Sequence, residues 1–380
     1  MVITHKLRLK ATPGRHARLQ RALDHSRDLY NAGLEERISA WRKRRVGLTK
    51  YDQFKALTTL HSEDLFDEYA TAMQRWPLAK LHDAFQAFFK RLKKGDKAGF
   101  PRFRSEVRFN TFGFSDRGGW SFDGRAVTMK GVGRFPAKLH RPIEGEVRSL
   151  MIKREGRKWF ALIGVRLDPA STHATGAVVG IDMGTTHLAT LSTGEHLANI
   201  RTSRRLAPKI AEAQRALARA NRGSKRRARV KERFLRLKRH EANCRSTHLH
   251  QQSAALTRRF ATIVIEDLNI RNMMRSAKGT IEQPSTNVAQ KTGLNRSIGD
   301  AAWGRFAELL TYKAERAGGS VVRVNPRNTS NECSRCHAIT PSKIGDLFSC
   351  HSCGMSMDRD HNAALIIMRR GVVAPIAEAA

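Results

Sequence analysis

The chain has 380 residues and carries 70 Lys and Arg against 34 Asp and Glu, which gives a formal net charge of +36. This length excludes a single minimal module and suggests two to four structural units. A charge of this size collects polyanions, so nucleic acid is the expected partner and a small-molecule substrate is not expected. Because 40% of the residues are hydrophobic, the chain can still fold around a core.

Apolar runs such as Ala364–Met368 are far too short to span a membrane. Four of the five cysteines form two neighbouring C-x-x-C pairs, a spacing that favours metal binding over disulfides. We therefore expect a soluble monomer in a reducing compartment, namely a prokaryotic cytosol or nucleoid.

The first half of the chain alternates between strand and helix patterns. Polar and apolar residues alternate over the first ten residues and predict a strand, which Pro13-Gly14 ends. From Ala17 to about Lys94 the apolar residues recur at helical spacing. From Gly99 to Asp168, short alternating segments separated by Gly-rich turns predict a small β unit. The opening strand has no nearby partner, so we expect it to join this unit, with the helices as an excursion from it.

The second half begins with a hairpin and a basic segment. Residues 176–191 contain two apolar strands around a turn at 184–186, which suggests the opening hairpin of an α/β sheet. Residues 201–245 carry 17 Lys and Arg but three acids, at helical spacing, with a break at 221–224 and Ser224 as a candidate N-cap. Three acids cannot neutralise seventeen bases, so we expect a basic helical hairpin that contacts phosphates rather than a self-compensated surface.

The remaining elements follow in a simple order. A buried strand is expected at Thr262–Ile265, followed by a polar stretch up to Ile298. A helix (Asp300–Arg316), a strand (Ser320–Val324), the cysteine cluster and a last helix (Asp360–Arg370) complete the chain.

The cysteine cluster has the pattern C-x2-C-x13-C-x2-C. Two pairs can complete a tetrahedral shell of four sulfurs around one structural zinc ion, and this closed shell leaves no open position for catalysis. The expected ligands are Cys333, Cys336, Cys350 and Cys353.

Three carboxylates stand at the edges of apolar elements. Asp182 and Glu266 each end an apolar run, and Asp360 opens the apolar last helix. A buried acid is costly unless cations or hydrogen bonds compensate it. Three such acids that converge would bind two divalent metal ions, which could activate water in phosphodiester hydrolysis.

Alternatives exist for this acidic site. Asp267 and Asp358 are neighbouring acids, but strand alternation directs Asp267 away from Glu266, and Asp358 precedes the last helix. The segment Gly180–Thr186 also looks like the phosphate loop of actin-like and sugar-kinase ATPases. A second phosphate loop and an adenosine loop are not found, and a +36 chain with a zinc pattern is a poor sugar kinase.

The three acids and the cysteine pattern together resemble the TnpB family, transposon-encoded proteins formerly termed OrfB transposases and related to type V CRISPR effectors. The resemblance rests on GIDMG, IVIEDLNI and DRDHNAA around the acids. Further segments in the same order are FFKRLKKGDKAGFPRF (88–103), GSKRRARVKERFLRLKRHEANCRSTHLHQQSAAL (223–256), SIGDAAWGRFAELLTYKAERAG (297–318) and VNPRNTSNECSRC (324–336).

The resemblance implies an α/β multidomain fold. It implies a wedge-like β-barrel at residues 1–12 and 100–170, interrupted by a helical recognition domain at 13–99. An RNase H-like (RuvC) nuclease domain would take 171–330 and 356–380, with a zinc ribbon inserted at 331–355.

The resemblance also implies a function. The chain would bind a noncoding guide RNA, recognise a short adjacent motif in double-stranded DNA, and cut that DNA with Mg²⁺ held by Asp182, Glu266 and Asp360. The alternatives are an RNA-guided repressor that does not cleave and a transposition-associated DNA-binding protein. His361 departs from the family, which more often has an apolar residue there.

Nucleic-acid contacts are expected at basic and polar positions that match the family. The positions expected to contact phosphates are Lys90, Arg91, Lys93, Lys94, Arg226, Arg227 and Arg229. Trp76, Lys80, Asn110 and Thr111 lie where the family contacts the adjacent motif, although Trp76 also fits the spacing of a core residue.

Overall fold

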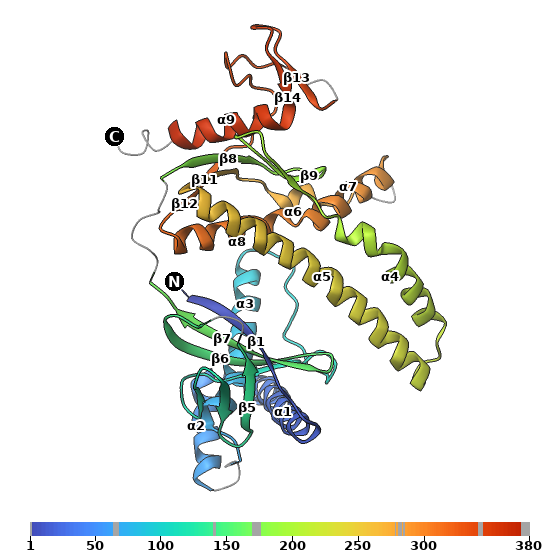
Figure 1. Ribbon diagram of the computed structural model, residues 1–380. Coiled ribbons are helices and arrows are strands. Elements are labelled where there is room, and N and C mark those ends of the chain that lie inside the picture. The colour runs from blue at the N-terminus through green and yellow to red at the C-terminus, as the bar shows by residue number, and fades with distance from the viewer. Residues whose placement is uncertain are drawn as a thin grey trace. The chain divides into compact units, whose positions relative to one another are not determined.

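The computed structural model describes residues 2–63, 68–139, 142–168, 176–277, 279, 283, 286–340 and 345–373. The chain divides into two compact units, Met1–Asp168 and Pro169–Ala380 (Figure 1). Within the described ranges, no helix is both long and apolar enough to cross a membrane.

The first unit is built on a seven-stranded antiparallel sheet with the order β2-β6-β7-β1-β5-β4-β3. Its strands are β1 (Val2–Leu9), β2 (Thr111–Gly113), β3 (Trp120–Phe122), β4 (Ala126–Met129), β5 (Gly133–Lys138), β6 (Glu146–Glu155) and β7 (Lys158–Arg166). The opening strand pairs with β7 over its whole length, from Val2 opposite Arg166 to Leu9 opposite Trp159. The expectation that β1 joins the later β unit is confirmed.

This sheet has to curl. β2 and β3 are its two edge strands, yet six residues separate Gly113 from Trp120. In a flat sheet the edges would lie about 29 Å apart at a strand spacing of about 4.8 Å, farther than the roughly 25 Å that this connection spans when fully extended. The rings of Phe114 and Trp120 lie 6.2 Å apart, beside the two edges. The curl fits the β-barrel that the family resemblance implies for this unit.

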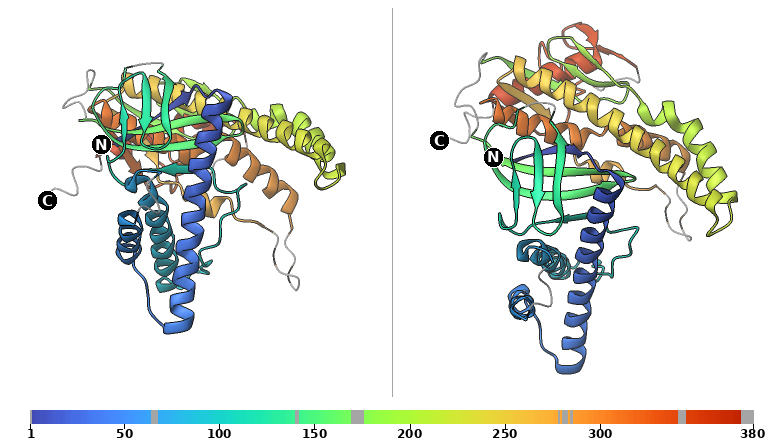
Figure 2. Two further views of the ribbon diagram at one scale, coloured as in Figure 1. Left: turned by 90° about the horizontal axis from the view of Figure 1, so that it is seen from below. Right: turned by 60° about the horizontal axis from the view of Figure 1, so that its bottom comes forward.

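Along the chain, three described helices follow β1 and precede β2. They are α1 (Pro13–Arg44), α2 (Lys50–Ser62) and α3 (Thr71–Lys93) (Figure 2). The N-terminal halves of α1 and α3 share the core of the sheet, where Leu19, Leu23 and Met73 pack with Phe112 and Trp159. Farther along the helices, Tyr30, Leu34 and Leu81 form a separate small core. The helical excursion is therefore anchored in the sheet at one end and held together by its own contacts at the other.

The second unit contains a five-stranded sheet with the order β10-β9-β8-β11-β12. Its strands are β8 (Val178–Asp182), β9 (His187–Leu191), β10 (His196–Ala198), β11 (Thr262–Glu266) and β12 (Ser320–Val324). The first three form an antiparallel meander, and β11 and β12 run parallel to β8. This confirms the predicted hairpin and the two later strands.

Helices cover both faces of this sheet (Figure 1). The helices of the unit are α4 (Thr202–Arg219), α5 (Lys225–Arg259), α6 (Ile270–Met273), α7 (Val288–Ala301), α8 (Trp303–Arg316) and α9 (Arg359–Val373). On one face, Ile181 and Ile265 pack with Leu256 of α5 and Phe306 of α8. On the other face, Val264 and Val324 pack with Ile367 of α9.

The contact between α9 and the sheet is close at Gly180. A Cβ atom on this residue would stand 2.2 Å from the carbonyl oxygen of Ala364 and 2.5 Å from the nitrogen of Met368. Both atoms belong to the backbone of α9, so the helix would have to move away to admit any side chain. Alternation along β8 places Asp182 on the same face as Gly180.

The basic hairpin forms as expected. The hydroxyl of Ser224 accepts a hydrogen bond of 3.1 Å from the backbone N–H of Arg227, so Ser224 is the N-cap of α5. The helices α4 and α5 run side by side (Figure 1).

The region before Trp303 differs from the expectation. The stretch expected to be polar and irregular contains α7, and the expected single helix from Asp300 is broken at Ala302, which has a positive φ of 54°. Asp300 accepts hydrogen bonds of 3.0 Å from the backbone N–H of Ser203, and the indole of Trp303 donates to the carbonyl of Gly184 at 3.0 Å. These tertiary contacts hold the two helices in different directions.

The replacement Gly180→Ala should lower the free energy of unfolding by about 1–3 kcal/mol, because it forces α9 away from β8. The measurement is the unfolding midpoint of the full chain in urea. The matched control is Gly293→Ala in α7, where nothing lies within 4 Å of the added Cβ. This control should keep or raise stability, by about 0.5–1 kcal/mol. An equal loss in both variants would contradict the packing argument.

Candidate functional site

The three carboxylates come together at one end of the β8–β11 pair. Asp182 is the last residue of β8 and Glu266 the last residue of β11. The two strands are parallel neighbours with Ile181 opposite Ile265, so the next residue of each strand lies at the same edge of the sheet. Asp360 stands in the first turn of α9, which packs on these strands. The structure therefore brings together the acids that the sequence singled out.

The acids influence one another electrostatically. Burial, with a further contribution from the charges of Glu266 and Asp360, raises the pKa of Asp182 to about 7. Burial also raises the pKa of Glu266, which is 8% exposed. Opposing that shift, the hydroxyl of Thr329 donates a hydrogen bond of 2.5 Å to Glu266 Oε1, and Arg370 contributes a positive charge.

Positive charge near the acids is limited. The guanidinium of Arg359 lies 3.3 Å from Asp360 Oδ1, and Arg370 acts on Glu266. Mg²⁺ prefers oxygen ligands, such as those of carboxylates. The donor set and its excess negative charge therefore fit divalent cations, although the three carboxylates do not form as tight a group as the cysteines described below.

The neighbouring acids have other roles. Asp267 is 68% exposed and lies 3.4 Å from the guanidinium of Arg323. Asp358 accepts a hydrogen bond of 2.7 Å from the backbone N–H of His361, as an N-terminal cap of α9 does. The ring of His361 lies 3.1 Å from the carbonyl oxygen of Ser192, at the turn that follows β9.

The four cysteines form the second cluster. Cys333 and Cys353 have sulfurs 3.7 Å apart, and Cys336 and Cys350 have sulfurs 3.5 Å apart. Among the residues that the structure describes, these four are the one set of three or more His, Cys, Asp or Glu whose ligand atoms all lie within 4.8 Å of one another. Such a set can hold one tetrahedral metal ion.

Two similar turns carry the sulfurs. In the first, the N–H of His337 donates to the carbonyl of Cys333 at 2.9 Å, and in the second the N–H of Gly354 donates to the carbonyl of Cys350 at 3.0 Å. His337 and Gly354 both have positive φ, of 62° and 68°. A hydrogen bond from the backbone N–H of Cys353 is the main cause that lowers the pKa of the Cys350 thiol, whereas burial and the neighbouring thiols raise the pKa of Cys336. A thiolate is the form that binds metal. The second turn lies between β13 (Leu347–Ser349) and β14 (Ser356–Asp358), which pair antiparallel.

The expected phosphate contacts on α3 are exposed. These are Lys90, Arg91, Lys93 and Lys94 at the end of that helix. They stand beside a group of phenylalanine rings in which Phe88 and Phe100 lie 5.5 Å apart. Phe89 and Phe100 are themselves about half exposed. A basic surface with exposed rings suits nucleic acid, which offers phosphates and stacking faces.

The three arginines expected on α5 do not behave alike. Arg226 and Arg229 are exposed. Arg227 instead donates hydrogen bonds of 2.7 Å to the carbonyls of Leu217 and Ala220, at the end of α4. Arg227 therefore closes the helical hairpin, and its contact with phosphate stays a prediction.

The residues expected at the adjacent motif are also placed differently. Trp76 is 8% exposed and packs within the first unit, whereas Lys80 pairs with Asp83 at 2.9 Å and lies 5.9 Å above the Trp76 ring. The hydroxyl of Thr111 donates to the side chain of Asn110 at 2.9 Å. Their role in reading DNA stays a prediction.

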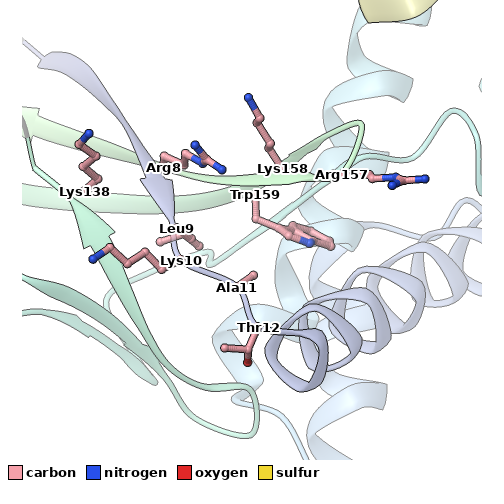
Figure 3. Close-up of a pocket in the computed structure, with 9 residues that line it drawn as sticks. All are labelled: Arg8, Leu9, Lys10, Ala11, Thr12, Lys138, Arg157, Lys158 and Trp159. Atoms are coloured by element: carbon pink, nitrogen blue, oxygen red, sulfur yellow. The ribbon is translucent and has the colours of Figure 1, made fainter. Parts of the chain in front are cut away.

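The first unit has a basic pocket of about 420 Å³ that the sequence did not indicate (Figure 3). Five cationic side chains line it, namely Arg8, Lys10, Lys138, Arg157 and Lys158. Leu9 and the buried Trp159 also line it. Within the described residues, Arg8, Lys10, Lys138 and Lys158 make no ion pair with an acid. The pocket is therefore a third candidate contact for phosphate, besides α3 and α5.

Comparisons with known proteins agree with this arrangement. Three family models match, described as "Helix-turn-helix domain" over residues 1–45, "Probable transposase" over 163–277 and "Cas12f1-like, TNB domain" over 303–367. The chain is 31% identical over 297 residues to "Putative RNA-guided DNA endonuclease InsQ" of Escherichia coli, which covers 77% of this chain and 73% of that protein. It is 30% identical to "Putative RNA-guided DNA endonuclease" of Streptomyces pristinaespiralis, over 97% of this chain and 89% of that protein. The chain belongs to the TnpB family.

The fold of this TnpB chain is similar to that of a solved structure. A chain in the cryo-EM structure of the Cas12f1–sgRNA–target DNA complex matches with a TM-score of 0.57 at 13% identity, over 92% of this chain and 82% of that chain. At this identity the likeness concerns the fold alone. Over residues 1–45, the structure of the TnpB chain has one strand and one long helix rather than two helices.

Sequence reasoning missed residues of two separate candidate sites of this TnpB chain. Thr329 is a buried hydroxyl bound to Glu266, yet it lies in a polar loop without periodicity. Arg8 and Lys10 are visible in the sequence as basic positions of the first strand, but their pocket includes Lys138 and Lys158, far along the chain. Only the strand pairing brings these positions together.

The replacement Asp182→Asn should stabilise the magnesium-free TnpB chain, more strongly at pH 8 than at pH 5. The ordinary carboxyl pKa of 3.8 rises to about 7 in the folded chain. Between these values the unfolded carboxyl is ionised and the folded one is protonated, so wild-type stability falls as the pH rises from about 4 to 7. Asparagine does not ionise and removes this loss.

The measurement for Asp182→Asn is the unfolding temperature from pH 5 to pH 8 in buffer without magnesium and without chelator. The exposed Asp267→Asn is the matched control, and its unfolding temperature should follow the wild type at every pH. A gain in Asp182→Asn that does not grow with pH would count against the electrostatic argument.

Proposed function

We propose that this protein is an RNA-guided DNA endonuclease. It binds a noncoding guide RNA, pairs that RNA with double-stranded DNA next to a short adjacent motif, and hydrolyses DNA phosphodiesters. The single observation that carries the proposal is the meeting of Asp182, Glu266 and Asp360 at one edge of the sheet in a chain with a net charge of +36. Relatives named as RNA-guided DNA endonucleases support it.

The domain assignment is part of the proposal. The order β10-β9-β8-β11-β12, with an antiparallel meander followed by two parallel strands, supports an RNase H-like (RuvC) domain over 171–330 and 356–380. The curled sheet supports a wedge-like β-barrel over 1–12 and 100–170, and the three helices support a recognition domain over 13–99. The cysteine turns and the β13–β14 pair support a zinc ribbon over 331–355.

The catalytic residues are Asp182, Glu266 and Asp360, which would hold two Mg²⁺ ions. Bound there, the ions supply Lewis-acid chemistry and a more acidic water molecule for attack on phosphorus. The protein holds the carboxylates in fixed positions: strand pairing fixes Asp182 and Glu266, and α9 fixes Asp360. Thr329 orients Glu266 by donating to its Oε1. Cys333, Cys336, Cys350 and Cys353 would hold one structural Zn²⁺ ion.

The basic surfaces serve nucleic-acid binding. The arginines on α5, the lysines at the end of α3 and the pocket lined by Arg8 can each contact the phosphate backbone, which carries affinity but little sequence information. Base pairing by the guide RNA then supplies the sequence specificity. Binding through many phosphate contacts, with specificity supplied by the RNA, suits a protein whose positive charge is spread over several elements.

Replacing any one of the three acids should abolish cleavage while RNA binding is kept. The assay coexpresses the chain with its native downstream flank, purifies the complex, and challenges a plasmid library with randomised bases beside the target. We expect Mg²⁺-dependent loss of one adjacent motif, and a fall of more than about 100-fold with Asp182→Ala, since a metal ligand is lost. Asp267→Asn is the matched control and should cut normally.

Other outcomes of the library assay have clear meanings. Selective binding with guide-length RNA but no cutting by the wild type would replace the proposal with a repressor function. Heterogeneous RNA without a preferred motif would favour a transposition-associated DNA-binding protein.

The replacement Arg8→Gln should weaken guide RNA binding and lower the slope of log K against log salt by about 0.7–0.9, as expected when one phosphate contact is lost. Arg125→Gln is the matched control, because Arg125 is an exposed arginine of the same unit, in the turn between β3 and β4, and does not line the pocket. Titration of labelled RNA at several salt concentrations measures both quantities. Equal slopes for the two variants would remove the pocket from the RNA interface.

A further inference from the structure

The side-chain amide of Asn362 forms hydrogen bonds with the residues before and after Cys333, the first cysteine of the cluster. Its Oδ1 accepts a hydrogen bond of 2.9 Å from the backbone N–H of Ser334, and its Nδ2 donates one of 2.7 Å to the carbonyl of Glu332. Cys333 is the residue between these two. Asn362 is 0% exposed, so both hydrogen bonds are shielded from water. A side chain that lies two residues after Asp360 therefore holds the peptide groups on both sides of Cys333.

A second side chain of α9 holds the same loop. Arg370 donates hydrogen bonds of 2.8 Å to the carbonyls of Asn325 and Arg327, and one of 2.6 Å to the carboxylate of Glu332. The loop from Asn325 to Ser334 is thereby fixed to α9 at both of its ends. Between these ends, Thr329 donates to Glu266.

The loop thus connects the cysteine cluster with two of the three acids. One connection runs through Asn362 to the first turn of α9, where Asp360 stands. The other runs through Thr329 to Glu266. A displacement of Cys333 would move the backbone that Asn362 binds, and would disturb both connections.

We infer that Asn362 is a positioning residue that couples metal binding at the four cysteines to Mg²⁺ binding at the acids. The inference rests on the proposed function and adds to it that the ribbon acts on the catalytic centre from within the same chain. Residues that orient metal ligands typically change metal affinity by about 10–100-fold when they are replaced. Asn362 touches no reacting group, so its effect is on the geometry of Asp360.

A double-mutant cycle on the full chain tests the coupling. The four proteins are the wild type, Cys336→Ser, Asn362→Ala and the double variant. For each, the apparent Mg²⁺ affinity is obtained from the rise of the unfolding temperature with Mg²⁺ concentration, and zinc is counted by mass spectrometry. Each single variant should weaken Mg²⁺ binding by about tenfold or more. The double variant should be no weaker than the single variants, because both remove the same connection.

Two further variants separate positioning from a general loss of structure. Asn295→Ala is the matched control, because the Asn295 amide also bonds two backbone groups, donating to the carbonyls of Met274 at 3.0 Å and Arg275 at 3.2 Å, but it lies on α7. It should leave Mg²⁺ affinity unchanged. Asn362→Asp keeps the oxygen that accepts from the Ser334 N–H and loses only the donor to Glu332, so it should show a smaller loss than Asn362→Ala. Both Asn362 variants should retain one equivalent of zinc and bound RNA.

Several results would overturn the inference. These are Mg²⁺ affinities that fall additively in the double variant, a Cys336→Ser protein with unchanged Mg²⁺ affinity, or loss of zinc in both Asn362 variants. If one of these results is found but the wild type still binds Mg²⁺ and cleaves DNA, the inference about Asn362 fails and the proposed function stands. A wild type with neither a Mg²⁺-dependent shift nor cleavage would instead remove the proposed function itself.

Discussion

The close contact between α9 and β8 is the constraint on which the acidic site depends. Because residue 180 is glycine, the helix backbone approaches the strand to a distance that a Cβ atom would block. The first turn of α9 then reaches the ends of β8 and β11, and Asp360 joins Asp182 and Glu266 there. A helix N-terminus also favours a carboxylate, by about 0.3–1 kcal/mol at exposed sites. A wider separation would leave two acids at a sheet edge and a third out of reach.

The charge distribution works at two distances. At physiological salt, exposed charges are screened beyond about 8 Å. An approaching phosphate backbone is therefore attracted by the basic surfaces first, and the acids repel it only when it comes within that distance of them. At short range, three carboxylates repel a phosphodiester as well as one another. The raised pKa of Asp182 reflects first its burial and then the charges of Glu266 and Asp360. Divalent cations bound by the acids, as proposed, would reverse this local sign. A strongly basic protein can thus contain an acidic centre and still bind nucleic acid.

Local patterns predicted the elements, and tertiary contacts decided what the patterns could not. The apolar runs that end in Asp182 and Glu266 predicted two strands with acids at their ends, and Ser224 predicted a helix start. The sequence did not predict α7, because that helix buries few apolar residues, Ile298 and Ala301 among them. It could not separate Arg227 from Arg226 either, since only the position of the α4 carbonyls makes Arg227 a hairpin contact. Asn362 and Thr329 also gave no periodic signal, because their partners are backbone or carboxylate groups of other segments.

The cysteine cluster lies in the connection between β12 and α9, so its folding affects how firmly α9 and Asp360 are held near the other acids. The connection from the end of β12 at Val324 to the start of α9 at Arg359 comprises 34 residues, and it contains all four cysteines. Closing a flexible loop costs entropy that grows with its length, so an unstructured connection would hold α9 less firmly than a cross-linked one. A metal ion bound by the four thiolates would cross-link residues 333 to 353, and its binding would couple to folding. The segment left between β12 and the cluster is then short enough for Arg370 and Asn362 to hold, and the position of Asp360 is fixed by hydrogen bonds instead of by a long loop.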